Sequence, residues 1–252
     1  MQAQTRSRAR LDELLVARGL FRSRSRARDA ILRGAVRVSG EVVARPAEST
    51  PADADIAVDD PASRYVSRAA LKLLAGLDAF GFDPSGLVAL DIGASTGGFS
   101  QVLLERGAAH VVAIDVGHGQ MDAGLAADAR VSLHEGVNAR SLDRALLGGR
   151  SCDAVVCDVS FISLTLALPP ALEIADPGAF AVVLVKPQFE AGKNAIGKGG
   201  IVDPATARRV AADMRAWFDA QPGWRVSGLV ASPVDGGDGN REFLLGAVKE
   251  HG

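Results

Sequence analysis

The chain has 252 residues, 48% of them hydrophobic and 23% charged, which is typical of a globular protein with a sizeable core. No apolar run approaches the ~18 residues that span a bilayer, so we expect no membrane partner. The net charge of −2 hides an asymmetry, because residues 1–45 hold eleven arginines against four acidic residues. This segment carries +7 and the rest −9. The imbalance predicts a nucleic acid partner for the basic segment, although a solvated N-terminus would carry the same charge.

The first 45 residues predict two short helices and a β-hairpin. The leucine spacing in RLDELLVARGL and the apolar stripe in SRSRARDAILRG give each helix one apolar face, and Ser23 is a candidate N-cap. The stretch AVRVSGEVVA alternates and turns at Ser39-Gly40. The Pro-, Ala- and Asp-rich stretch that follows completes this domain, so we predict one domain of residues 1–60 and another of residues 61–252. The candidate RNA-binding residues are Arg8, Arg10, Arg22, Arg24, Arg26, Arg28 and Arg33.

From Tyr65 onward, strand candidates alternate with helix candidates. The expected strands are 87–92, 110–115, 131–134, 153–159, 180–186, 225–231 and 241–248, and the expected helices are 66–80, 97–106, 140–147, 161–175 and 204–220. Such alternation predicts an α/β fold with a Rossmann-like, mainly parallel sheet covered on both faces. No helix separates the last two strands, so we expect them to be antiparallel at the sheet's edge. Ligands bind such sheets at the carboxyl ends of the strands.

A glycine-rich loop follows the first of these strands in LVALDIGASTGGFSQVLLERG. Gly93, Gly97 and Gly98 let a ligand approach the backbone ahead of a helix N-terminus. The loop is not G-x-G-x-x-G, and Asp91 before it disfavours a pyrophosphate. The next strand ends on Asp115, where a carboxylate can bind ribose hydroxyls. S-adenosylmethionine fits these features; a structural glycine turn in another nucleotide- or sugar-binding sheet is the alternative. The candidate cofactor-binding residues are Asp91, Gly93, Ser95, Thr96, Gly97, Gly98, Asp115 and Asn138.

Four charged side chains lie at or beside the same predicted sheet edge. Asp158 and Lys186 end two strands, and Glu242 begins the antiparallel one. Lys72 lies on the helix before the glycine loop. Each alone is more simply a solvated end of an element, but together, at the edge that carries the cofactor loop, they indicate a catalytic site. Two lysines and two carboxylates can remain charged while partly buried. Burial and a neighbouring cation lower a lysine pKa, so such a group could deprotonate a hydroxyl or stabilise its alkoxide.

The residues around these charges narrow the chemistry. The stretch DVSF lacks the prolines of the D/N-P-P-aromatic motif common in amino-group methylases. Cytosine C5 methylation needs a cysteine nucleophile, and we expect Cys157 to face the core. Cys152 lies five residues earlier in a predicted strand, hence on the opposite face, so neither a metal pair nor a redox pair is expected. Asn138 could contact adenine, cap the next helix, or do both. A ribose hydroxyl is the acceptor that best matches a lysine pair.

These motifs together resemble a known family. The body is similar to the FtsJ-like ribose 2′-O-methyltransferases, whose mark is a Lys-Asp-Lys-Glu tetrad. The matching positions are Lys72, Asp158, Lys186 and Glu242. The first 60 residues resemble the S-four RNA-binding module, named after a ribosomal protein, through RLDELLVARGL, SRSRARDAI and GAVRVSGEVV. With VSRAALKL, DIGASTGGFS, DVSFISL, LVKPQFEAG and KGGIV, the chain closely resembles the TlyA-type proteins, which are often labelled hemolysins.

The resemblance implies a fold, an activity and a partner. The fold is a Rossmann-like S-adenosylmethionine-dependent methyltransferase sheet preceded by a small α+β RNA-binding domain. The activity is methylation of a ribose 2′-OH, that of cytidine, in ribosomal RNA. Lys186 would be the base, the other tetrad residues would position it, and the glycine loop with Asp115 and Asn138 would hold S-adenosylmethionine. No metal is expected.

Several features qualify this prediction. Some family members carry Arg-x-Trp-Val before Ser-Arg; here Ser63, Arg64 and Tyr65 stand in SRYVSR, so a coupling role of that linker is not implied. The loop GKNAIGKGG could be a flap that offers Lys193 and Lys198 to RNA phosphate, or a plain solvated loop. A non-catalytic RNA-binding or ribosome-assembly factor, opposed by the complete tetrad, and a membrane-lytic hemolysin are the alternative hypotheses. Scarce cysteines and the lack of a signal-peptide core predict a cytoplasmic location.

Overall fold

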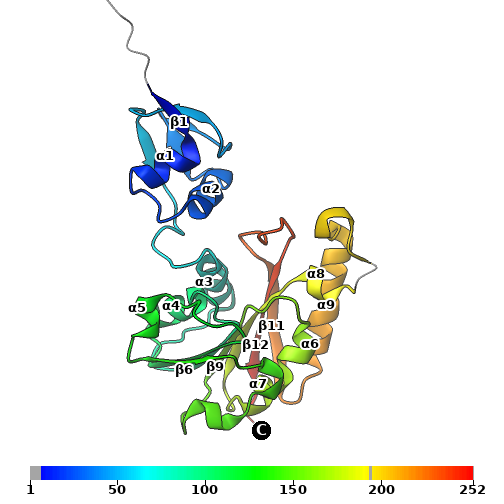
Figure 1. The fold of residues 1–252 in the computed structure, drawn as a ribbon. Helices are drawn as coiled ribbons and strands as arrows, with labels where there is room; N and C mark the ends of the chain where they lie inside the picture. Colours follow the sequence, from blue (N-terminus) through cyan, green and yellow to red (C-terminus); the bar gives the residue numbers. More distant parts are fainter. Residues whose placement is uncertain (1–6, 193–194, 252) are drawn as a thin grey trace, which may run out of the picture. The chain divides into compact units, whose positions relative to one another are not determined.

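The computed structural model describes residues 7–192 and 195–251 (Figure 1). The chain divides into two compact units, Met1–Arg64 and Tyr65–Gly252. Arg6 of the basic segment, Lys193 and the side chain of Lys198 lie outside the described part. Each unit has a hydrophobic core of its own.

The first unit contains the two predicted helices and the predicted hairpin, together with three short strands that the sequence did not reveal. Ser23 caps the second helix by accepting the amide hydrogen of Arg26. Ser39 and Gly40 turn the hairpin with φ angles of 51° and 86°. The elements are β1 (Arg8–Arg10), α1 (Leu11–Ala17), α2 (Arg24–Leu32), β2 (Val36–Val38), β3 (Glu41–Val42), β4 (Ser49–Pro51) and β5 (Ile56–Val58). The stretch after the hairpin is therefore not only a linker, because β4 pairs with β1 and β5 with β2.

The second unit is built on a seven-stranded sheet with the order β11-β12-β10-β9-β6-β7-β8. Strand β12 runs antiparallel to β10 and β11, and the remaining pairs are parallel. The predicted fold class is therefore confirmed. The strands are β6 (Val88–Ile92), β7 (His110–Asp115), β8 (Val131–Glu135), β9 (Ala154–Cys157), β10 (Phe180–Val185), β11 (Trp224–Ala231) and β12 (Phe243–Lys249).

The helices of this unit follow the predicted alternation with local differences. They are α3 (Ala69–Phe80), α4 (Gly98–Glu105), α5 (Ala123–Ala126), η1 (Ala139–Ser141), η2 (Arg144–Leu147), α6 (Leu164–Ala167), α7 (Pro169–Ile174), α8 (Pro187–Glu190), η4 (Lys198–Gly200) and α9 (Pro204–Asp219). The helix expected over 140–147 is two 3₁₀ turns. The helix expected over 161–175 is divided at Pro169, because two successive prolines cannot donate backbone hydrogen bonds within a continuous helix. The short helices α5 and α8 were not predicted.

Helices cover both faces of the sheet (Figure 1). Helices α3 and α4 pack on one face, and α6, α7 and α9 pack on the other. The expectation that Cys152 and Cys157 occupy opposite faces is wrong, because both pack in the same core layer. Strand β9 begins only at Ala154, so Cys152 precedes the strand and does not follow its alternation.

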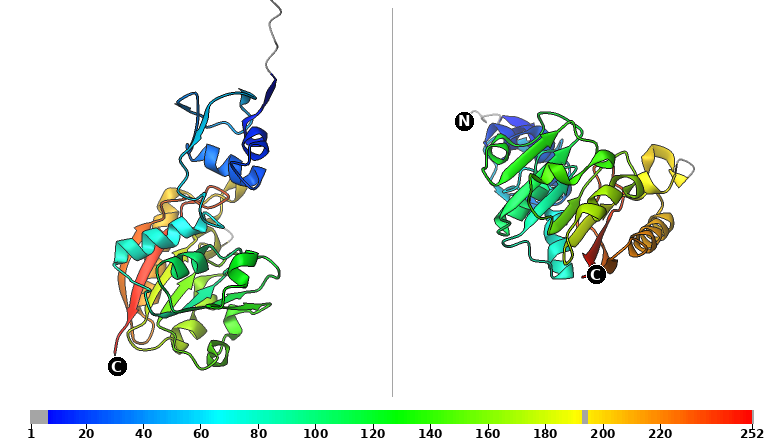
Figure 2. Two further views of the ribbon diagram at one scale, coloured as in Figure 1. Left: turned by 90° about the vertical axis from the view of Figure 1, so that its left-hand side faces the viewer. Right: turned by 90° about the horizontal axis from the view of Figure 1, so that it is seen from below.

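Helix α3 lies across the antiparallel part of the sheet, against β10, β11 and β12 (Figure 2). Two glycines permit this close approach. A β-carbon at Gly76 would come within 2.7 Å of Val182, and one at Gly246 would overlap the ring of Phe80. The helix that carries Lys72 is therefore held closely against the strand that follows Glu242.

A Gly246→Ala substitution tests this packing. The added methyl group forces the Phe80 ring aside, and overpacking of this kind costs about 1–3 kcal/mol, which urea denaturation would measure. In a Phe80→Leu background, which removes the obstructing ring, the same substitution should cost much less. An equal loss of unfolding free energy in both backgrounds would contradict the proposed close contact.

Candidate active site

The topology gathers the predicted catalytic residues at one edge of the sheet. Asp115 ends β7, Asp158 follows β9, and Lys186 follows β10. Val185 pairs with Phe243 in the antiparallel register, so Glu242, just before β12, lies beside the end of β10. Because β12 runs against its neighbours, its start lies at the carboxyl edge, which is where ligands bind such sheets.

The four charged residues form two ion pairs. Lys72 Nζ donates a hydrogen bond to Glu242 Oε2. Lys186 Nζ lies 2.6 Å from Asp158 Oδ1, an ion pair without the alignment of a directed hydrogen bond. Lys186 also donates to Ser160 Oγ at 2.9 Å. The Lys72, Glu242 and Lys186 residues are 5%, 4% and 9% exposed, so these charges are shielded from water and rely on one another.

The two ion pairs also act on each other. Burial raises the pKa of Glu242, and Lys72 opposes that increase. Lys186 and Asp158 lie close enough to contribute to the Glu242 pKa with opposite signs. Taken singly, each of these residues could be the solvated end of an element. Lys72, Lys186 and Glu242 are buried and the Asp158 side chain is 15% exposed, which contradicts that simpler interpretation. The structure thus brings together all four residues predicted as the tetrad.

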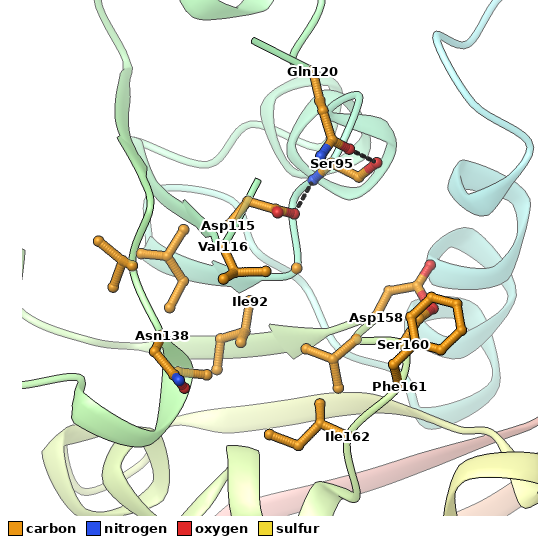
Figure 3. A pocket seen from close by; sticks show the side chains of 15 residues that line it. Ile92, Ser95, Asp115, Val116, Gln120, Asn138, Asp158, Ser160, Phe161 and Ile162 are labelled. Atoms are coloured by element: carbon orange, nitrogen blue, oxygen red, sulfur yellow. Dashed lines mark hydrogen bonds between the residues drawn. The ribbon is translucent and has the colours of Figure 1, made fainter. Parts of the chain in front are cut away.

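A pocket of about 560 Å³ is lined in part by Asp158 of the second ion pair (Figure 3). Asp115 lies at its wall and accepts backbone hydrogen bonds from Ser95 (2.8 Å) and Gly117 (2.7 Å). Asn138 lines the same pocket, and its side chain also caps η1 by accepting from Arg140. Both alternatives considered for Asn138 are therefore compatible. Apolar side chains complete the lining, among them Ile92, Ile114, Val137 and Ile162.

The glycine loop connects this pocket to the ion pairs. Gly93 has a φ of 80°, and a β-carbon there would come within 2.8 Å of the Asp158 carbonyl oxygen. A smaller pocket of about 160 Å³ shares Gly93, Ser95, Asp158 and Ser160 with the first. Its further lining residues are Ser67, Ala69, Ala94, Thr96, Gly98, Phe99 and Lys186. A ligand lying along the loop would thus reach the Lys186–Asp158 pair.

Two predicted cofactor residues line neither pocket. Gly97, at a φ of 93°, packs against Leu125 of α5. Asp91 is fully buried, and Ser100 Oγ donates to its Oδ2 at 2.6 Å. Its other oxygen has no hydrogen-bond partner among the described residues. Burial, only partly offset by the Ser100 hydrogen bond, raises the pKa of Asp91 to about 7.

Ser160, Gln120 and Phe161 are among the pocket residues that the sequence did not predict. Ser160 contacts Lys186, and Gln120 accepts a hydrogen bond from Ser95 at 3.0 Å (Figure 3). Phe161 has a positive φ of 66° and is 90% exposed, although it is a large apolar residue. It lines both the main pocket and a third, open hollow that also includes Phe189, at 5.1 Å between ring centroids. Ser160 and Phe161 belong to the DVSF motif. A polar and an aromatic residue directly after the strand-ending Asp158 were the signal in the sequence that could have marked them as site residues.

The arginines of the first unit differ in how strongly they are held. Arg10 and Arg24 both donate to the buried Asp12, at 3.0 and 3.3 Å; the Arg10 hydrogen bond is the largest cause of the lowered pKa of Asp12. Arg33 pairs with Asp29 and Asp60. Arg8 donates to Ser49, and Arg26 to the Ala62 carbonyl. Arg22 and Arg28 are exposed. Arg33 is therefore held by two carboxylates, Asp29 and Asp60.

Three other features were sought in the described residues: a cysteine nucleophile, a metal site and a membrane-spanning helix. Burial raises the pKa of the Cys157 thiol, which opposes a nucleophilic role for it. No group of three or more His, Cys, Asp or Glu side chains in residues 7–192 and 195–251 could hold a metal ion. Among the helices of that same part, none combines the length and hydropathy needed to cross a membrane.

The raised pKa of Asp91 predicts a pH effect on stability. The folded state favours the protonated form, so this contribution is present below the ordinary pKa of 3.8 and is lost as the pH rises to about 7. The slope is at most about 1.4 kcal/mol per pH unit. Asp91→Asn, which stays neutral, should unfold at higher urea concentration than the wild type above pH 7, and the two should converge near pH 4. Asp203→Asn is the control of opposite sign, because hydrogen bonds from Thr206 lower the pKa of that cap residue. Parallel curves for Asp91→Asn and the wild type would contradict a buried, proton-binding Asp91.

Comparisons with known proteins agree with this architecture. The model of the FtsJ-like methyltransferase family matches residues 65–249, and that of the S4 domain, the S-four module, matches residues 9–49. The 16S/23S rRNA (cytidine-2′-O)-methyltransferase TlyA of Mycobacterium tuberculosis is 48% identical over 94% of this chain and 89% of its own length. Hemolysin A of Brachyspira hyodysenteriae is 37% identical over 93% of this chain and 98% of its own. The solved structure of a hemolysin-named protein from Streptococcus thermophilus has a TM-score of 0.74 and 38% identity, covering 98% of this chain and 90% of that one. The chain therefore belongs to the TlyA-type FtsJ-like methyltransferases and is a methyltransferase with an S4 domain.

Proposed function

We propose that this protein transfers a methyl group from S-adenosylmethionine to the 2′-hydroxyl of a cytidine ribose in ribosomal RNA, in the cytoplasm. The observation that carries the proposal is the pair of buried ion pairs, Lys72–Glu242 and Lys186–Asp158, beside a pocket suited to a nucleoside. The name of the Mycobacterium tuberculosis relative supplies the acceptor, cytidine 2′-O in rRNA. The FtsJ-like match over residues 65–249 supports methyl transfer as the reaction class.

The pockets fit S-adenosylmethionine in size and in the groups they present. A volume of about 560 Å³ lies in the usual range for a small-molecule site. Asp115 would accept hydrogen bonds from the ribose hydroxyls, and Asn138 would contact the adenine edge between apolar side chains. The glycine loop would hold the amino-acid part in the smaller pocket, which Thr96 and Ser67 line. When bound, the cofactor would supply an electrophilic methyl group, and Lys186 lines the smaller of the two pockets that would hold it.

Lys186 would take up the proton of the acceptor hydroxyl. Its Nζ would accept that proton, so that the O–H bond would break as the C–O bond forms; the methyl–sulfur bond of the donor would break in the same step, and S-adenosylhomocysteine would leave. Asp158 and Ser160 orient the amine, at 2.6 and 2.9 Å. Glu242 holds Lys72 in place and balances its charge.

The acceptor must reach this edge as an unpaired nucleotide. Sequence-specific RNA recognition depends on splayed bases that stack on aromatic side chains, and the exposed ring of Phe161 lies beside the cofactor pocket. The arginines of the first unit would contribute affinity through phosphate contacts. Arg10 and Arg24 are fixed by Asp12, so their guanidinium groups would meet a phosphate with little loss of side-chain entropy.

Methylation of ribosomal subunits tests the proposal. Subunits and precursor rRNA lacking the modification are incubated with the protein and methyl-labelled S-adenosylmethionine, and ribose methylation is mapped by resistance to alkaline cleavage. We expect label at the 2′-oxygen of a cytidine. The Lys186→Ala variant should retain cofactor and RNA binding and incorporate no label. Label on a base, or no label in any subunit or precursor, would overturn the proposal.

A further inference from the structure

Lys72 of the tetrad lies on α3, and the other three tetrad residues lie on three segments, each of which follows or precedes a strand at the carboxyl edge. The segment after β9 carries Asp158, and the segment after β10 begins with Lys186. Glu190 of α8 joins these two, because its carboxylate accepts from Ser163 Oγ at 2.5 Å and from the Leu164 amide at 2.8 Å. The third segment joins β11 to β12 and ends at Glu242. The position of Glu242 therefore depends on the contacts that hold this third segment.

A buried asparagine makes that connection. Asn240 is only 1% exposed. Its Oδ1 accepts the Val202 amide hydrogen at 2.8 Å, and its Nδ2 donates to the Gly200 carbonyl at 2.9 Å. Both partners belong to residues 195–202, which we call the flap loop because they form the described end of the predicted flap. Among the described residues, both hydrogen bonds that join the flap loop to a later part of the chain end on this one side chain.

The backbone of Asn240 continues the connection toward the ion pair. Its carbonyl accepts the Gly236 amide at 2.8 Å, and its amide donates to Asp238 Oδ1 at 3.1 Å. Gly236 in turn packs directly on the tetrad, because a β-carbon there would come within 2.8 Å of Glu242 Oε1. Residues 236–240 therefore form a tight turn, which we call the glycine turn, that packs against the carboxylate paired with Lys72.

We propose that Asn240 is a positioning residue that fastens the flap loop to the glycine turn and thereby holds Glu242 against Lys72. Asn240 does not touch the cofactor pockets, so it acts through Glu242. The flap loop becomes part of the catalytic apparatus, because displacement of the loop releases the turn that supports the carboxylate. This inference rests on the proposed function, since it assigns a supporting role in the same reaction.

A double-mutant cycle between Asn240→Ala and Glu242→Gln tests the connection, because only coupled residues give non-additive effects. The rate constant is measured in a single turnover at saturating RNA and S-adenosylmethionine. Asn240→Ala alone should slow methyl transfer by about 10- to 100-fold, as small displacements of catalytic groups do, with unchanged cofactor affinity. In the Glu242→Gln background it should slow the reaction by less than about 2-fold. Asn240→Asp, which keeps the acceptor for Val202 and loses the donor to Gly200, should fall between the wild type and Asn240→Ala.

A matched control separates this role from general destabilisation. Gln221 also donates a side-chain hydrogen bond to a backbone carbonyl, that of Trp217, at 2.8 Å, and it lines none of the three pockets described. Gln221→Ala should leave the rate constant unchanged. A wild-type rate in Asn240→Ala, or equal slowing in both Glu242 backgrounds, would overturn the inference.

An independent readout keeps this inference distinct from the proposed function. In hydrogen exchange on the free protein, Asn240→Ala should speed exchange at the Val202 and Gly236 amides and leave those of β7 unchanged. A wild-type protein that methylates no RNA would contradict the proposed function while leaving this structural link testable. Unchanged exchange at both amides would overturn the link itself.

Discussion

Two lysine side chains buried at the end of a hydrophobic sheet are the constraint on which the second unit depends. An ammonium removed from water costs several kcal/mol unless a counter-ion is close, and here each has one, Glu242 for Lys72 and Asp158 for Lys186. Glu242 reaches the edge only because β12 is antiparallel, so that Phe243 pairs with Val185. Lys72 reaches it only because glycines on both sides of the interface let α3 lie directly on the strands. The antiparallel direction of β12 and the close packing of α3 thus both allow the buried Lys72 to have Glu242 as its counter-ion.

The same edge carries the pockets that the proposed reaction would use. The glycine loop lies between the ion pairs and Asp115, and Ser95 and Asp158 line both the large and the small pocket. A donor held along the loop and an acceptor nucleotide approaching past Phe161 would therefore meet at Lys186. Glu190 and Asn240 join the three segments at this edge, so the geometry of the amine depends on loops as much as on strands.

Much of this arrangement could be predicted from the sequence because it follows from periodicity and strand order. The run FAVVLVKP gave a buried strand that ends in a cation, and the missing helix between the last two strands indicated their antiparallel pairing. Which lysine pairs with which carboxylate could not be predicted: the sequence placed Lys72 on the helix before the glycine loop, and the structure buries it against Glu242. Asp91 is buried against Ser100 and does not line the pocket. Its side chain follows the alternation of strand β6 between the two faces of the sheet, and the loop motif after the strand does not change that direction. Phe161 and Asn240 depend on tertiary contacts of irregular loops, for which no period exists.

The central claim is that the Lys186 amine takes the proton of the ribose hydroxyl, and a pH–rate profile of Lys186→Arg tests it most directly. Arginine keeps the positive charge beside Asp158 but cannot release a proton in this range, so the acid–base role is removed while the charge is kept. The account predicts that wild-type single-turnover methylation rises with pH to a plateau. It predicts that Lys186→Arg is slower by at least about 100-fold and lacks that rise, with cofactor and RNA affinities unchanged. A Lys186→Arg protein with the wild-type rate and the wild-type pH dependence would contradict it.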